Sequence, residues 1–156
     1  MRPRVFSLAL VWCAIACILC SCAGSNTSGV ADGDRFGRVD NSLDKLTDSY
    51  EKENIDSFMG GVAKDYDLDS FTLERLIQDE FDRYSAFDVS IVIDRVSTDS
   101  SGSIVFADTH WTKRRVSLKT GREGRQSGRT TFIFRIMPDG NLVLTGMKGD
   151  RLYGSP

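Results

Sequence analysis

Residues 129–147, RTTFIFRIMPDGNLVLTGM, decide the fold because they join an alternating apolar pattern to a strong turn signal. Large apolar residues at every second position indicate one buried face of a strand. These are Phe132, Phe134 and Ile136. In Pro138-Asp139-Gly140, proline presets the turn, aspartate bonds the nearby backbone and glycine takes the left-handed conformation. The stretch therefore predicts a hairpin between strands over Arg129–Met137 and Leu142–Met147.

Two more strands are predicted upstream of this hairpin. Residues 87–94, FDVSIVID, alternate apolar and polar positions with the period of a strand. Residues 98–103, TDSSGS, have the composition of a turn. Ile104–Val116 after it is long enough for a further strand. The four segments predict an antiparallel meander, because each follows its neighbour through a short connection.

The chain before these strands has a helical period instead. Apolar residues recur at spacings of three and four in three groups: Leu43, Leu46 and Tyr50; then Ile55, Phe58, Met59, Val62 and Tyr66; then Leu73, Leu76, Ile77, Phe81 and Tyr84. Asp40 or Asn41 is a predicted cap of the first helix and Asn54 of the second. We expect Gly60-Gly61 to weaken or bend the second helix, and Asp65–Ser70 to separate it from the third. Helices followed by strands predict an α+β fold, with N-terminal helices packed on a curved four-strand antiparallel sheet.

Three stretches carry a resemblance to a known fold. They are LDKLTDSYEKENIDSFMGGVAKDY (residues 43–66), Val105–Trp111, and Asp139-Gly140 through Gly154. These resemble the opening helices, the long central strand and the last hairpin with its tail in the nuclear transport factor 2-like superfamily. That superfamily includes the ketosteroid isomerase and polyketide cyclase cone. The resemblance covers most of residues 40–154 and implies the cone fold. A cystatin-like helix on a sheet is the nearest alternative.

The chain departs from this family at two places. The gap between the second and third helices is short for the strand or small hairpin that many members place there. Asn141 and Leu142 stand where members often carry a tryptophan.

The first residues have the pattern of an export signal. Arg2 and Arg4 precede an apolar run from Val5 to Cys20, interrupted only by Ser7. As a helix this run would rise about 24 Å, short of the roughly 30 Å of a bilayer core, so a permanent span is disfavoured. Leu19-Cys20-Ser21-Cys22 resembles the bacterial lipobox. The resemblance implies lipid attachment at Cys22 and removal of residues 1–21 as a lipoprotein signal peptide.

A lipidated Cys22 has three consequences for the rest of the chain. Residues 22–38 are rich in Gly, Ser, Asp and Asn, so we expect a flexible tether before a domain over residues 39–156. No cysteine remains after Cys22, which excludes disulfides, a thiol nucleophile and thiolate metal sites. Attachment through lipid predicts a cell-envelope protein, on the outer membrane facing the periplasm if the source has two membranes. An ordinary secretory signal, and Cys20 as a rival acceptor, are the alternatives.

Charge is divided unevenly along the chain. Residues 32–94 hold 17 acidic and 7 basic side chains, while residues 95–156 hold 5 acidic and 11 basic ones. We expect the two halves to attract each other within one domain.

Two sequence patterns suggest sites, and each also has a purely structural interpretation. Asp108 and His110 share one strand face and, with Tyr50, Tyr66 or Tyr84, could form an acid/base pair if that face were concave. We favour a polar outer face instead, and hence no catalytic residues. Asp65, Asp67 and Asp69 begin like a calcium loop, but Ser70 and Leu76 stand where that loop needs glycine and glutamate. With a single histidine in the chain, no metal site and no cofactor are predicted.

A basic stretch follows the predicted central strand. Its members are Lys113, Arg114, Arg115, Lys119, Arg122, Arg125 and Arg129, with Glu123 as the one acid among them. It predicts contact with anionic lipid head groups or an acidic protein partner, or else a solvated hairpin. Nucleic acid is not expected as a partner, because the N-terminus predicts an exported lipoprotein and no aromatic residues are interleaved for stacking.

The sequence thus leads to two hypotheses about function. The first is a membrane-anchored, non-enzymatic binding or structural module. The second is a small-molecule binder or isomerase-like enzyme that uses the cone pocket. They differ in whether Asp108 and His110 face a cavity or water.

Overall fold

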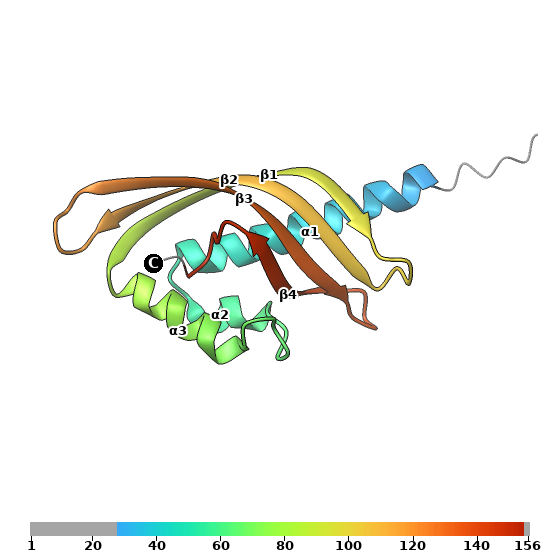
Figure 1. Ribbon diagram of the computed structural model, residues 1–156, viewed down its shortest axis with the longest axis horizontal. Coiled ribbons are helices and arrows are strands. Elements are labelled where there is room, and N and C mark those ends of the chain that lie inside the picture. Colours follow the sequence, from blue (N-terminus) through green and yellow to red (C-terminus); the bar gives the residue numbers. More distant parts are fainter. Residues whose placement is uncertain (1–27, 155–156) are drawn as a thin grey trace, which may run out of the picture. The chain divides into compact units, whose positions relative to one another are not determined.

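The computed structural model describes residues 28–154 (Figure 1). Its helices are α1 (Ser28–Glu51), α2 (Ile55–Gly60) and α3 (Ser70–Phe81), and its strands are β1 (Tyr84–Thr98), β2 (Ile104–Ser117), β3 (Glu123–Ile136) and β4 (Leu142–Gly149). A compact unit begins at Asp34 and contains all four strands. The predicted α+β class is confirmed. The predicted signal segment and Cys22 lie outside the described residues.

The sheet is the predicted antiparallel meander, in the order β1-β2-β3-β4. Figure 1 shows its long strands curving over the helices. The Pro138 turn is as expected: Gly140 has φ +84° and the Asp139 carboxylate accepts the Asn141 N–H at 3.0 Å. β3 begins earlier than predicted, at Glu123, because its first residues pair with β2 as far as Val116.

Alternate residues of the sheet build the core against the helices. On β2 the inward positions are Val105, Ala107, Thr109, Trp111, Lys113 and Arg115, all buried. The helices contribute the predicted apolar stripes, including Leu43, Leu46, Tyr50, Phe58, Leu73 and Ile77. This burial is the main stabilising contribution to the domain.

The predicted tether is wrong over its second half. Residues 28–38 are helical and belong to α1. Four residues of α1 at helical spacing, from Val39 to Tyr50, are buried against the core. Because helix formation is cooperative, this docked part of α1 favours helix in the residues before it. Arg38 adds an ion pair one turn back to Asp34, with 3.3 Å between Nε and Oδ2. These contributions offset the cost of Gly33 and Gly37, about 1 kcal/mol each.

The second helix is shorter than predicted and ends at Gly60. Asn54 caps it as expected, accepting the Ser57 N–H at 3.0 Å. A Cβ on Gly61 would lie 2.8 Å from the Leu46 side chain, so glycine permits the close approach of α1 there. The chain then runs beside β4, where the Ala63 N–H donates to the Leu144 carbonyl at 2.8 Å.

The short gap between α2 and α3 holds extended backbone that pairs with β4. Val62 forms a parallel bridge with Leu144, and the Asp67 N–H donates to the Thr145 carbonyl at 2.9 Å. A few extended residues thus cover part of the β4 edge, which would otherwise expose unpaired backbone groups.

The acidic and basic halves of the chain meet in the fold, as predicted. Ion pairs between them join Asp65 to Arg135, Asp88 to Arg114, and Glu80 to Lys113 and Arg115. No helix within residues 28–154 has the length and hydropathy needed to span a membrane.

Candidate functional site

The candidate acid/base pair lies on the outer face of the sheet, where Asp108, but not His110, lines an open hollow of about 340 Å³. Asp108 lies on the outer face of β2, where its carboxylate accepts hydrogen bonds from Thr131 and Arg95, and these lower its pKa. His110 lies on the same face, with Nδ1 2.8 Å from the Asp94 carboxylate, and its side chain is 51% exposed. Both residues therefore belong to the polar outer face of the sheet and not to the interior between sheet and helices.

The three tyrosines suggested as partners are elsewhere. The Tyr50 hydroxyl accepts a hydrogen bond from Lys113 at 3.3 Å in the core. The Tyr84 ring lies under the guanidinium of Arg115, 3.8 Å from its centroid. The Tyr66 hydroxyl is buried and has no hydrogen-bond partner within residues 28–154, and burial raises the pKa of that phenol to about 12.

The interior of the cone holds a buried cluster of charges. Glu80 of α3 accepts hydrogen bonds from Lys113, at 2.6 Å, and from Arg115. Lys113 also donates to the Leu152 carbonyl at 2.6 Å. The side chains of Glu80 and Lys113 are 0% exposed. Such a cluster is tolerated only because each charge meets an opposite charge or a polar partner.

Burial decides the protonation in this cluster. Removal from water lowers the pKa of Lys113 to about 8, although Glu80 opposes this by favouring the ammonium. The ammonium therefore stays protonated at pH 7. The Tyr50 pKa is raised, first by burial and then by the Glu80 charge, so the phenol stays neutral.

Aromatic rings fill the space around these charges. Tyr153 is fully buried, with its ring centroid 5.0 Å from that of Tyr50 and 4.9 Å from that of Phe58. Its hydroxyl shares a hydrogen bond with Thr47 at 2.9 Å. Aromatic side chains from α1, α2 and the segment after β4 thus pack together in the interior, beside the buried charges.

The buried charge cluster is absent from the sequence-based expectations, although the sequence carries a signal for it. Lys113 and Arg115 continue the inward positions of β2, in step with Val105 and Trp111. Glu80 follows Leu73 and Ile77 on the buried stripe of α3. An acid and two bases on predicted buried faces indicate a buried ion pair, but only the fold shows that they meet.

The aspartates at 65, 67 and 69 do not form a calcium loop. Asp65 pairs with Arg135 at 2.9 Å. Asp69 caps α3 by accepting the Phe71 N–H at 3.4 Å. Nowhere in the described part of the chain do three or more metal-ligating side chains gather.

The basic stretch is divided by the fold. Lys113 and Arg115 point into the core, and Arg114 pairs with Asp88 on the outer face. The remaining four cations, Lys119, Arg122, Arg125 and Arg129, are exposed on the β2–β3 hairpin. Leu118 at its tip is 59% exposed. The basic stretch therefore places fewer cations on the surface than the sequence suggested.

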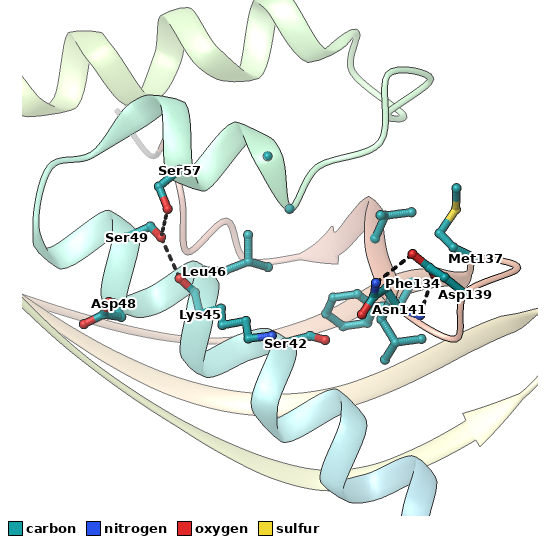
Figure 2. Close-up of a pocket in the computed structure, with 14 residues that line it drawn as sticks. Ser42, Lys45, Leu46, Asp48, Ser49, Ser57, Phe134, Met137, Asp139 and Asn141 are labelled. Carbon is teal, nitrogen blue, oxygen red and sulfur yellow. Dashed lines mark hydrogen bonds between the residues drawn. The ribbon is translucent and has the colours of Figure 1, made fainter.

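An open groove lies between α1, the end of α2 and the β3–β4 hairpin (Figure 2). It has a volume of about 610 Å³. Its apolar lining comes from Leu46, Phe134, Met137, Leu142 and Val143. Its polar lining comes from Ser42, Lys45, Asp48, Ser49, Ser57, Asp139 and Asn141. Ser49 and Ser57 share a 2.9 Å hydrogen bond that joins the two helices at one wall.

A second hollow of about 390 Å³ continues this groove along α1. It is lined by Arg38, Asn41, Ser42, Lys45, Gly140, Asn141 and Leu142, so the two hollows share four residues. We call both together the α1 groove. The sequence-based expectations do not include it, although Arg38, Ser42, Lys45 and Ser49 form a polar stripe at helical spacing beside the apolar one.

Solved structures resemble this fold at low sequence identity. A ketosteroid isomerase-like protein from Erwinia carotovora atroseptica SCRI1043 is 13% identical, with TM-score 0.62, over 77% of this chain and 96% of that one. An NTF-2 like protein of unknown function from Shewanella oneidensis MR-1 is 12% identical, with TM-score 0.57, over 75% and 99%. A putative polyketide cyclase from Xanthomonas campestris pv. campestris is 17% identical, with TM-score 0.53, over 72% and 89%.

At these identities the resemblance concerns the fold and not the chemistry. No family model matches the sequence, and no curated protein matches it either. The helices, the curved antiparallel sheet and these structural neighbours together show that the domain has the nuclear transport factor 2-like cone fold.

Proposed function

We propose that this protein is a lipid-anchored, non-enzymatic binding module of the cell envelope. The observation that carries the non-enzymatic part is the filled interior. Glu80, Lys113 and Tyr153 are fully buried there, and none of them lines any of the hollows described above. Asp108 and His110 are on the outer face and bound to other side chains.

The anchor in this proposal is the lipidated Cys22. The charged start, the apolar run and the Leu19–Cys22 motif support it. Two or three acyl chains hold a protein firmly to a membrane, since each buried CH₂ contributes about 0.8 kcal/mol. In a source with two membranes, we place the protein on the outer membrane, facing the periplasm.

Replacing Cys22 with serine should abolish lipid attachment. The lipid is transferred to the cysteine thiol, and serine has a hydroxyl in its place. We expect the variant to incorporate no radiolabelled palmitate and to accumulate as a precursor that still carries residues 1–21. Cys20→Ser is the matched control and should be labelled and cleaved normally. Palmitate labelling that survives in Cys22→Ser would contradict Cys22 as the acceptor. Labelling that is lost in Cys20→Ser would contradict the assignment in the same way, because it would point to Cys20.

The second part of the proposal is that the β2–β3 hairpin contacts anionic lipid head groups. Lys119, Arg122 and Arg125 are exposed on the same hairpin as Leu118, an exposed apolar residue at its tip. Cations beside an apolar tip suit a surface of phosphates over hydrocarbon. An acidic protein partner is the competing outcome.

Neutralising these three cations should weaken vesicle binding strongly, because each contributes about 1 kcal/mol near an anionic surface. The protein to use is the chain from residue 22 with Cys22→Ser, which has no lipid and keeps the complete core. We expect it to sediment with phosphatidylglycerol vesicles and not with phosphatidylcholine vesicles. Lys119→Gln, Arg122→Gln and Arg125→Gln together should abolish this.

The control makes the same charge change on the helical side of the domain. Lys52, Lys64 and Arg75 are exposed there, and their replacement with glutamine should leave vesicle binding intact. Equal binding to both vesicle types, or equal loss in the two triple variants, would contradict the hairpin as the contact.

A further inference from the structure

The α1 groove differs in chemistry from one end to the other. The hollow that continues it is lined by two cations and by no carboxylate. These are Lys45 and Arg38, of which Arg38 is also paired with Asp34. Asn41, Ser42 and Asn141 add hydrogen-bonding groups at the same end. Figure 2 shows Ser42 and Lys45 on one wall and Asn141 on the other. This end is built to receive a negative group.

The two acids that line the α1 groove belong to the larger hollow and not to this end. Asp48 pairs with Lys52, with 2.7 Å between Oδ1 and Nζ. The Asp139 carboxylate accepts two hydrogen bonds from Asn141, which lower its pKa and keep it charged. Lys45 is exposed and forms no ion pair within residues 28–154, so its ammonium is available to a ligand.

The larger hollow offers an apolar lining next to this charged end. Leu46 and Phe134 are part of the core, and Met137 is 37% exposed at the rim. A volume of about 610 Å³ lies within the range of sites that hold small molecules, roughly 300–1,000 Å³. Leu142 lines both hollows, so the charged and apolar parts meet there.

We propose that the α1 groove binds a single-chain anionic amphiphile. Its negative head group, carboxylate or phosphate, lies between Lys45, Arg38 and Asn141, and its hydrocarbon chain lies along Leu46, Leu142 and Met137. This deepens the proposed binding function by naming a ligand class, and it rests on that function. It is separate from the interior of the cone, which the side chains fill.

The test is a calorimetric titration of the Cys22→Ser chain from residue 22 with dodecanoate below its micelle concentration. We expect saturable binding of one dodecanoate molecule per chain. Decanoate, which is shorter by two methylene groups, should bind about tenfold more weakly. Dodecyltrimethylammonium, which has the same chain and the opposite charge, should not bind. Lysophosphatidylglycerol in a parallel titration distinguishes a phosphate head group from a carboxylate as the preferred form.

Three variants locate the site. Lys45→Glu should lower dodecanoate affinity about tenfold or more, because it replaces a charge-assisted contact with repulsion. Ser42→Trp should block the groove without changing its charge. Lys119→Gln, which removes an equally exposed cation on the β2–β3 hairpin, should bind normally. Thermal unfolding of each variant checks that the fold is intact.

The experiments distinguish a failure of the ligand proposal for the α1 groove from a failure of the proposed function. Absence of dodecanoate binding, equal binding of the cationic amphiphile, or binding unaffected by Lys45→Glu and Ser42→Trp would each overturn the groove proposal. Lipid attachment at Cys22 and vesicle binding by the hairpin are measured independently, so they survive or fail by their own results.

Discussion

Replacing Glu80 with alanine should lower the free energy of unfolding by about 3–5 kcal/mol, since it leaves buried cations without their counter-charge. Lys113 is 0% exposed and Arg115 is 7% exposed in their side chains, so water cannot take the place of the carboxylate. The two cations would also repel each other at short range. Because whole domains are stable by only about 5–15 kcal/mol, we expect a large loss of folded protein.

Urea unfolding of the chain from residue 22 with Cys22→Ser measures this effect. Glu123→Ala is the matched control, because that glutamate is exposed on β3 and should change stability by less than about 0.5 kcal/mol. Replacing Glu80, Lys113 and Arg115 together with methionine should recover much of the stability, as apolar replacements of buried ion clusters do. A loss below about 1 kcal/mol in Glu80→Ala would mean that water reaches the cluster.

Replacing Tyr153 with alanine should cost about 3–5 kcal/mol, the usual loss when a buried aromatic side chain leaves a cavity. Tyr153 is 0% exposed and touches rings from α1, α2 and β3, namely Tyr50, Phe58 and Phe132. Those rings are held by their own elements and cannot close the space completely. The variant should therefore unfold at a much lower urea concentration.

Tyr153→Phe separates packing from hydrogen bonding. It keeps the ring and removes only the 2.9 Å bond to Thr47, so we expect a loss of about 1 kcal/mol. If both variants lost the same stability, the hydroxyl would matter more than the ring, and the interior would be less tightly filled than the buried area indicates.

These two residues explain why the fold alone does not predict the function. Solved structures with the same cone include an isomerase-like protein and a putative polyketide cyclase. In this chain Glu80 and Tyr153 come from α3 and from the segment after β4, and both point into the interior. What occupies the interior of this domain is thus decided by a few inward side chains, and the shared fold does not specify them.

Local features could be predicted from the sequence, because their causes lie within a few residues. The Pro138-Asp139-Gly140 turn, the Asn54 cap and the alternation along β2 are predicted from neighbouring residues, and all are confirmed. The placement of Asp108 and His110 on a face opposite Val105 follows from the same alternation. The role of Cys22 rests on sequence alone and stays a prediction.

Features that depend on contacts between residues far apart in the sequence could not be predicted in this way. α1 extends back to Ser28 because its later turns are docked, although the composition of residues 28–38 favours a loop. Val62 leaves the helical pattern because the edge of β4 offers it a backbone partner. Glu80 and Lys113 are 33 residues apart in sequence and meet at 2.6 Å. A charge can be buried only where the fold places an opposite charge beside it, and no local pattern specifies that partner.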